Sequence, residues 1–336
     1  MSRVVSRIGE RLQEIWYGGR KPGLVLRALS ALYGAVVRMR RAAYRRGWLR
    51  VQRVRVPVIV VGNITVGGSG KTPFVIALVE HLCVRGWSPG VVSRGYGRRS
   101  RGQVTVDVAT STEAGGDEPV LIARRCGVPV VVDADRVAAA KRVIALGCDI
   151  VVADDGLQHY RLHRDVEIEI VEAGRRLGNA RLLPAGPLRE PYRDSTDLRI
   201  ENGLDELSAE GQSPHFELTG DTLLAGDGRA QPLEKWRGQR VHAVAGIGNP
   251  QRFFRSLRDK NIDIVEHGFP DHHAYAEEDL HFLERLPIIM TEKDWVKCER
   301  LAPANTWYLP VYAACSPGIM DEIDRMLAAI MGDRRD

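Results

Sequence analysis

Short continuous apolar runs alternate with helical patterns through the first half of this chain. Strand signals lie at residues 58–61, 90–93, 128–133, 149–154 and 166–171, and the apolar runs at 58–61 and 149–154 predict buried strands. Between them, apolar residues recur with a helical period at 74–82 and 135–146. This alternation predicts an α/β fold with a doubly wound, mostly parallel sheet.

A second α/β pattern begins near residue 241. It contains a strand, a helical pattern at 251–260 and further strands at 286–290 and 307–311. Its Gly246 and Gly248 form a lone G-x-G before Asn-Pro, which indicates a tight strand-to-helix turn rather than a dinucleotide site. Short extended segments between residues 216 and 229 predict a β-hairpin-like linker. We therefore expect four segments: a helical N-terminal segment (1–55), a core (56–214), a linker (215–235) and a smaller α/β domain (236–336).

The helical pattern that starts at residue 24 has two unlike faces. An arginine stripe with two small residues lies opposite an apolar stripe, and the stripes are Arg27, Ser30, Gly34, Arg38, Arg41 and Arg45 against Val25, Leu29, Leu32 and Val36. The apolar part is shorter than the ~20 residues that span a bilayer. It is followed by arginines and not by a small-residue cleavage site, so we expect no secretory signal. The pattern predicts either an interfacial helix on an anionic membrane or a surface helix that packs its apolar face on its own domain.

Composition narrows the class of protein. The 336 residues are 44% hydrophobic and 27% charged, an ordinary globular mixture that excludes disordered, collagen-like and coiled-coil chains. The net charge is only +5, but arginines are dense in residues 1–60, which favours contact with an anionic surface or nucleic acid. The five cysteines are scattered without a CxxC pair, so a disulfide framework or zinc ribbon is not expected and a reducing compartment fits.

The strongest chemical signal is the glycine-rich segment after the strand at 58–61. A strand, a glycine-rich turn and a helix form the context of a phosphate-binding loop (P-loop), whose residues here are Thr65, Val66, Gly67, Gly68, Ser69, Gly70, Lys71 and Thr72. Lys71 is expected to reach the β- and γ-phosphates, and the Thr72 hydroxyl to bind Mg²⁺. Thr65 stands where the usual pattern has its first glycine. We expect a functional nucleotide site.

The strand at 149–154 supplies the second half of such a site. It ends in Asp154 and Asp155, and ligands of open α/β sheets bind at the carboxyl ends of strands. The two carboxylates therefore fit the Walker B role of holding Mg²⁺. Asp-Asp-Gly is also turn chemistry, but its combination with the P-loop favours the functional interpretation.

Further polar clusters follow in a set order: SRGYGR at residue 93, GDEP at 116, DDGLQH at 154, LPAGPLRE at 183, FPDHHAY at 269 and MTEKD at 290. Together with GNITVGGSGKTP, they resemble the tetraacyldisaccharide 4′-kinases, the lipid A kinases of Gram-negative bacteria. The resemblance covers nearly the whole chain, and that family likewise lacks the first Walker glycine.

The resemblance implies a reaction and a place. Such kinases transfer the γ-phosphate of ATP to the 4′-hydroxyl of a tetraacylated disaccharide 1-phosphate, giving lipid IVA, with Mg²⁺, at the cytoplasmic face of the inner membrane. It also implies that Asp117 of GDEP pairs with His272 of the DH motif to deprotonate the sugar hydroxyl. His273 follows directly, so motif alignment alone chooses between the two histidines. We expect Asp117 in the first domain and His272 in the second, brought together when the cleft closes.

Other polar residues are weaker candidates. Arg94 and Tyr96 are candidates for contact with the disaccharide or its 1-phosphate, Arg189 and Glu190 for facing nucleotide or sugar, and Gln158 and His159 for orienting the Walker B carboxylates. Each is equally compatible with an ordinary surface loop. Two other functions compete with the kinase: a P-loop regulatory GTPase or metallochaperone-type NTPase, for which TEKD is the nearest match to a guanine-reading NKxD, and a nucleic-acid-stimulated ATPase. The chain lacks any helix-turn-helix signal or aromatic-interleaved basic groove, so nucleic acid is not an expected partner.

Overall fold

The computed structural model describes residues 2–193, 195–203 and 213–333. Contacts between residues divide the chain into two compact units that are discontinuous in sequence. The first comprises Met1–Lys71, Asp149–Glu217 and Cys315–Asp336, and the second comprises Thr72–Cys148 and Leu218–Ala314. The four continuous segments expected from the sequence stay a prediction.

Parallel strands form the centre of the first unit, in the order β8-β7-β6-β1-β5. Their bounds are β1 Val58–Gly62, β5 Ile150–Asp154, β6 Val166–Glu172, β7 Leu198–Asn202 and β8 His215–Thr219. Every residue of β1 and β5 is buried, as continuous apolar runs of a parallel sheet should be. These strands confirm the parallel α/β pattern read from the sequence.

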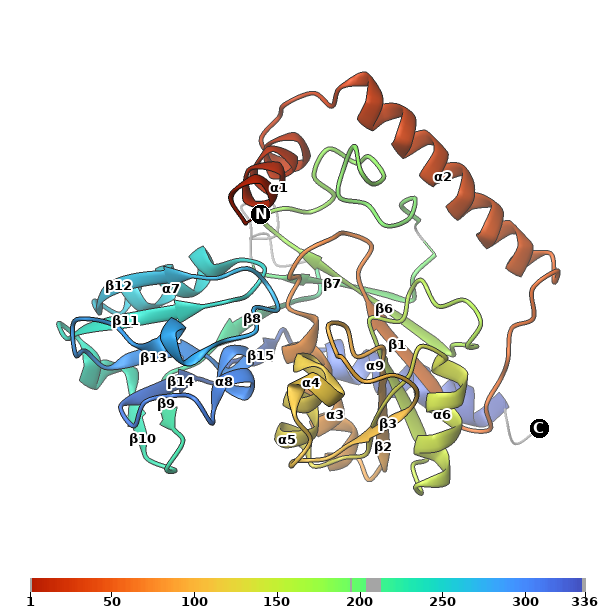
Figure 1. Cartoon of the computed structure of the whole chain (residues 1–336). Helices are drawn as coiled ribbons and strands as arrows, with labels where there is room; N and C mark the ends of the chain where they lie inside the picture. Colours follow the sequence, from red (N-terminus) through yellow and green to blue (C-terminus); the bar gives the residue numbers. More distant parts are fainter. Residues whose placement is uncertain (1, 194, 204–212, 334–336) are drawn as a thin grey trace. The chain divides into compact units, whose positions relative to one another are not determined.

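Three helices belong to this unit: α1 Ser2–Tyr17, α2 Leu24–Arg45 and α9 Ile319–Asp333. α2 is one long helix (Figure 1). Its sequence carries the arginine stripe to its end at Arg45. Its small and polar side faces the unit, because Ser30 Oγ donates to the Leu182 carbonyl at 2.7 Å and Tyr33 Oη to the Arg189 carbonyl at 2.7 Å. Leu32 and Val36, on its apolar side, are 64% and 50% exposed. The helix therefore does not pack its apolar face on the described residues of its own chain. Across those residues, no helix is both long and apolar enough to cross a bilayer.

The second unit contains a short set of strands with helices around it. β2 pairs with β4 in parallel and β4 with β3 antiparallel. The bounds are α3 Lys71–Val84, which begins at the last residue of the first unit, β2 Pro89–Ser93, β3 Val104–Val106, α4 Thr112–Gly115, α5 Asp117–Cys126, β4 Val130–Val132 and α6 Arg136–Ala145. α6 begins where predicted because the Asp135 carboxylate accepts from the backbone N–H groups of Val137 and Ala138.

The same unit holds a six-stranded sheet in the order β10-β9-β14-β13-β11-β12, seen in cyan to blue in Figure 1. Its elements are β9 Thr222–Ala225, β10 Ala230–Pro232, η2 Leu233–Trp236, β11 Arg240–Ala245, α7 Pro250–Asp259, β12 Asp263–Gly268, η3 Glu277–Leu280, β13 Ile288–Thr291, α8 Glu292–Cys298 and β14 Thr306–Leu309. β15, Tyr312–Cys315, crosses the boundary between the units. The predicted hairpin is present as β9 and β10, but β9 also pairs antiparallel with β14, so the hairpin is an edge of this sheet.

Candidate active site

The glycine-rich loop connects β1 to α3, and Lys71 is the first residue of the helix. Gly70 has φ +78°, and a Cβ at this position would lie 2.2 Å from Asn202 Nδ2. Asn202, at the end of β7 and 2% exposed, donates from this same nitrogen to the Ser69 carbonyl at 2.9 Å. The loop therefore rests on β7, and only glycine fits at position 70.

The Lys71 ammonium lies against two oxygen acceptors of the first unit. Its Nζ donates to Asn63 Oδ1 at 3.0 Å and lies 3.5 Å from Asp155 Oδ1. These contacts place the positive charge beside the carboxyl end of β5. This is the position expected of a lysine that binds phosphate in a P-loop.

A second stretch of backbone, from the LPAGPLRE segment, runs beside the start of the loop. The Val66 N–H donates to the Pro187 carbonyl at 2.9 Å, and the Arg189 N–H donates to the Ile64 carbonyl at 2.6 Å. This pairing places the Arg189 guanidinium on Asp155, with Nη1 2.9 Å from Oδ1 and 2.8 Å from Oδ2. Arg189 is thus brought to the phosphate-binding loop, as the sequence suggested.

The two Walker B candidates lie at and just beyond the end of β5. Asp154 is 4% exposed, and Asp155 adopts φ +50°, a left-handed conformation that aspartate tolerates better than most residues. Carboxylate and hydroxyl oxygens, such as those of Asp154, Asp155 and Thr72, are the hard donors that Mg²⁺ prefers. In the part of the chain that the structure describes, no group of three or more His, Cys, Asp or Glu is placed to hold a metal alone. Mg²⁺ in nucleotide sites is commonly held by one or two carboxylates together with substrate phosphates.

The second constellation is a carboxylate–histidine pair in the second unit. The Nδ1–H of His272 donates to Asp117 Oδ2 at 2.9 Å. Asp117 is the first residue of α5, and its position depends on Gly116, which has φ +91° and where a Cβ would lie 3.0 Å from Gly95 Cα. The glycines of SRGYGR and GDEP are thus required for one backbone contact, and that contact sets the start of α5.

His272 itself has an unusual backbone and a shifted pKa. Its φ is +60°, a conformation that costs free energy in a non-glycine residue and is common at functional sites. The hydrogen bond to Asp117 raises the pKa of the imidazole above its ordinary value, against the opposing effects of burial and of Lys293. Both members of the pair lie in the same compact unit and are already bonded, so the pair forms without the cleft closure expected from the sequence.

The neighbouring histidine has a different partner. His273 Nε2 lies 2.9 Å from Asp279 Oδ2, and its ring stacks on Phe269 with centroids 4.7 Å apart. Asp279 also accepts from the Ala276 N–H, so His273 belongs to a local turn. The geometry therefore places His272, and not His273, against Asp117.

Of the two SRGYGR candidates, one lies against the pair. The Tyr96 ring packs on the His272 imidazole with centroids 5.0 Å apart, while the Tyr96 side chain remains largely exposed. Arg94 is exposed at the surface. Tyr96 thus borders the carboxylate–histidine pair on its open side.

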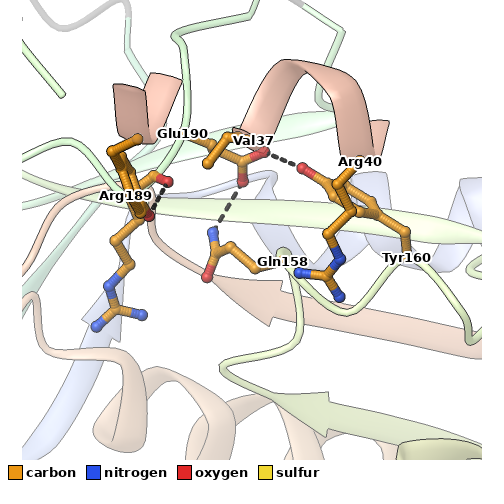
Figure 2. Close-up of a pocket in the computed structure, with 7 residues that line it drawn as sticks. Val37, Arg40, Gln158, Tyr160, Arg189 and Glu190 are labelled. Carbon is orange, nitrogen blue, oxygen red and sulfur yellow. Dashed lines mark hydrogen bonds between the residues drawn. The ribbon is translucent and has the colours of Figure 1, made fainter. Parts of the chain in front are cut away.

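Gln158 and Glu190 line a small cavity of about 100 Å³ between α2 and the loops of the first unit (Figure 2). Glu190, fully buried, accepts from Gln158 Nε2 at 2.8 Å and from Tyr160 Oη at 2.5 Å. Gln158 also donates to the Asn63 carbonyl at 3.1 Å, which links this cavity to the residue that holds Lys71. His159, half-buried, donates its backbone N–H to the Gly156 carbonyl at 2.9 Å.

Several residues at these sites were not singled out from the sequence. Asn63 and Asn202 hold Lys71 and the loop, Tyr160 binds Glu190, and Lys293 lies beside His272. Asn63 follows directly on the β1 strand, and Lys293 belongs to MTEKD, so both had a positional signal. Asn202 carried no such signal, because a single polar residue at the end of a strand is common and belongs to none of the motifs.

The family model described as "Tetraacyldisaccharide-1-P 4'-kinase" (LpxK) matches residues 23–328. The chain belongs to this family. A tetraacyldisaccharide 4′-kinase of Stenotrophomonas maltophilia is 54% identical over 314 residues, which cover 90% of this chain and 92% of that protein. One of Xanthomonas euvesicatoria is 52% identical over 322 residues, covering 92% and 93%.

A solved structure of the family has the same fold. It is an LpxK from Aquifex aeolicus in complex with ATP, 31% identical to this chain, and it aligns with a TM-score of 0.74 over 89% of this chain and 98% of that one. The predicted resemblance and the α/β fold are both confirmed.

Proposed function

We propose that this LpxK-family chain acts as an ATP-dependent tetraacyldisaccharide 4′-kinase of lipid A biosynthesis, through the residues described above. It transfers the γ-phosphate of ATP to the 4′-hydroxyl of tetraacyldisaccharide 1-phosphate and releases lipid IVA and ADP. The observation that carries this proposal is the Asp117–His272 hydrogen bond in a chain that also has a glycine-rich P-loop followed by Lys71 at the start of α3. A P-loop alone serves many NTPases, whereas an alcohol acceptor benefits from a base.

The P-loop binds and orients the nucleotide. Backbone N–H groups of the glycine-rich turn at residues 67–72 face the phosphates, while the Val66 N–H is taken by the Pro187 carbonyl. Lys71 stabilises the charge that spreads over the transferred phosphoryl group. Asp154, Asp155 and the Thr72 hydroxyl are the residues that would hold Mg²⁺, which when bound neutralises phosphate charge. Arg189, which binds Asp155, would fix that carboxylate and face the nucleotide.

The carboxylate–histidine pair manages the proton. As the 4′-oxygen bonds to phosphorus and the bond to ADP breaks, the proton of the hydroxyl passes to the pair. The Asp117 carboxylate holds the Nδ1–H tautomer of His272, which leaves Nε2 with its lone pair. Tyr96 and Arg94 lie in the loop beside His272, and we assign them to contact with the disaccharide or its 1-phosphate.

The residues that line the cavity of Figure 2 would position the nucleotide site without contacting the reacting groups. Gln158 links Glu190 to Asn63, and Asn63 in turn accepts from Lys71. We assign Gln158 and Glu190 to orienting this end of the nucleotide site, with His159 beside them. Since Glu190 is fully buried, direct contact with the sugar is not part of this assignment.

The apolar face of α2 would place the chain on a phospholipid surface. Leu32 and the other apolar residues of that face are exposed, while the opposite face holds the helix to its unit through Ser30 and Tyr33. A helix of this kind lies in the headgroup region of an anionic membrane. We infer peripheral or monotopic attachment at the cytoplasmic face of the inner membrane, where a tetraacylated substrate would be met.

The GTPase alternative is not favoured. In TEKD, Thr291 caps α8 and accepts from the Asp294 N–H at 3.1 Å, and Asp294 pairs with Lys297. Asp294 also accepts from the Gly246 N–H at 2.9 Å and is fully buried. These contacts explain the motif without a guanine base.

The test uses detergent-solubilised protein, Mg²⁺, γ-labelled ATP and tetraacyldisaccharide 1-phosphate. Label should appear in the lipid and should be lost in Asp117→Ala and His272→Ala. ATP turnover without labelled lipid, or selective competition by GTP, would contradict the proposal. The same assay without added Mg²⁺ tests the metal.

A further inference from the structure

A cluster of charges surrounds the Asp117–His272 pair. His272 Nε2, on the far side of the ring from Asp117, lies 3.8 Å from Glu118 Oε1 and 3.8 Å from Asp271 Oδ2. Both distances are too long for hydrogen bonds, although a small side-chain movement would make either one. Three carboxylates thus lie around one imidazole.

One cation holds the two outer carboxylates. Lys293 Nζ lies 2.6 Å from Glu118 Oε1 and 3.0 Å from Asp271 Oδ1. The ammonium is largely buried, and although burial lowers its pKa, Glu118 and Asp271 raise that pKa above its ordinary value overall. Lys293 is therefore positively charged and forms ion pairs with both carboxylates.

The element that carries Lys293 is held independently of it. α8 is capped by Thr291 and joined to α5 by the buried Arg125–Glu292 pair at 2.8 Å. Lys293 is consequently not needed to hold α8 on α5. Its side chain extends toward the Asp117–His272 pair from a helix that other contacts hold in place.

We propose that Lys293 is a positioning residue for the Asp117–His272 pair: it holds the carboxylates of Glu118 and Asp271 off His272 Nε2 and so leaves that nitrogen open to the sugar hydroxyl. This inference rests on the proposed function of the pair.

The charges support this role. The groups that face His272 are Asp117 and Glu118 from α5, Asp271 from the preceding loop, Lys293 from α8 and the uncharged ring of Tyr96. Among them Lys293 lowers the pKa of His272, while the hydrogen bond that His272 donates to Asp117 and the charges of Glu118 and Asp271 raise it. Without the ammonium, the pKa of His272 would be higher. The imidazole would then remain protonated up to a higher pH, and a protonated imidazole cannot accept the proton of the hydroxyl.

The experiment replaces Lys293 by methionine, which keeps the length of the side chain and removes the charge. Two quantities are measured: the His272 pKa, by NMR titration of histidine-labelled protein assigned with His272→Asn, and kcat and KM for ATP across pH. In Lys293→Met the His272 pKa should rise by about one unit or more. The midpoint of the acid limb of the kcat–pH profile should move to higher pH by the same amount, while KM for ATP stays unchanged. Lys293→Arg, which keeps the positive charge, should restore the wild-type profile.

Glu118→Gln provides the opposite test and does not depend on the folding of Lys293→Met. Removal of one carboxylate should lower the His272 pKa, so the two variants should shift in opposite directions. The matched control is Arg124→Met, which removes the 2.8 Å ion pair between α5 and Glu299, the residue that follows α8, and should leave the pKa unchanged.

The outcomes separate the two proposals. An unshifted His272 pKa in both Lys293→Met and Glu118→Gln overturns the positioning role. A shifted pKa together with full kcat in His272→Ala upholds the positioning role and overturns the proposed function of the pair.

Discussion

Lys71 and Asp155 form an ion pair across the phosphate-binding loop, with 3.5 Å between Nζ and Oδ1. Arg189 binds the same carboxylate at 2.8 Å. Two cations therefore converge on one Walker B candidate, and a bound polyphosphate would share them. Asn63 and Asp155 therefore already hold the Lys71 ammonium in place before a nucleotide binds.

Removal of this lysine should abolish most of the activity. We expect Lys71→Ala to lower kcat by about 10³-fold, because one preorganised charge on the transferred group is lost. The measurement is transfer of label from ATP to the lipid, with the melting temperature checked alongside. Lys141→Ala, on the exposed side of α6, is the control and should be normal. An undiminished rate in Lys71→Ala would mean that the loop is only structural.

The two adjacent histidines should behave differently. His272→Ala should depress kcat by about 10²-fold or more with little effect on ATP affinity, because it removes the partner of Asp117 and no phosphate contact. His273→Ala removes a bond to Asp279 in a local turn and should leave kcat within a few-fold. Kinetics of the two variants at saturating ATP decide this, and a larger loss in His273→Ala would show that the wrong histidine was chosen.

The activity should depend on pH through the pair. Since the hydrogen bond that His272 donates to Asp117 raises the pKa of His272 above its usual 6.5, the pair accepts a proton only when the pH exceeds that raised value. kcat should therefore rise with pH along a limb centred above 6.5. Asp117→Asn removes the largest cause of the shift and should move the limb to lower pH, with a lower plateau.

That profile is recorded as kcat against pH at saturating substrates, from pH 5.5 to 9 in steps of roughly half a unit, fine enough to resolve a shift of about one unit. Asp279→Asn, next to His273, is the control and should not move the limb. A limb that is identical in wild type and Asp117→Asn would assign the titration to another group.

Gly70 should be intolerant of any side chain. A Cβ there would lie 2.2 Å from Asn202 Nδ2, and its φ of +78° strains other residues. We expect Gly70→Ala to weaken ATP binding at least tenfold by displacing the loop from β7, as measured by calorimetry. Gly174→Ala, where a Cβ meets nothing within 4 Å, should bind normally. Equal affinities in the two variants would contradict the packing argument.

The apolar face of α2 should govern attachment to membranes. Replacement of Leu32 and Val36 by serine should reduce partition into anionic phospholipid vesicles by about tenfold or more, since each buried aliphatic side chain contributes roughly 1.5–3 kcal/mol. Vesicle sedimentation measures it. Val84→Ser, which removes a still more exposed valine at the end of α3, is the control. Unchanged partition of the α2 variant would mean that another surface attaches the chain.

Much of the architecture followed from local patterns. The strand signals became β1, β2, β4, β5 and β6. The runs at β1 and β5 are almost entirely apolar because a parallel strand buried on both faces favours apolar residues. The loop from Thr65 to Thr72 was recognisable because glycines, lysine and threonine must be close in sequence to surround one phosphate group. The amphipathic α2 was visible for the same reason, since its two faces repeat every turn.

The sequence alone thus determined the fold class and the glycine-rich loop, and it predicted candidate site residues. Only the tertiary structure decided between two adjacent histidines, turned the apolar side of α2 outward, and brought Asn202 under Gly70 and Lys293 to His272. The physical reason is the distance along the chain over which each interaction acts. Periodicity and turn chemistry act over a few residues, whereas each of these choices depends on contacts between segments far apart in the chain, which form only when the sheets and helices pack.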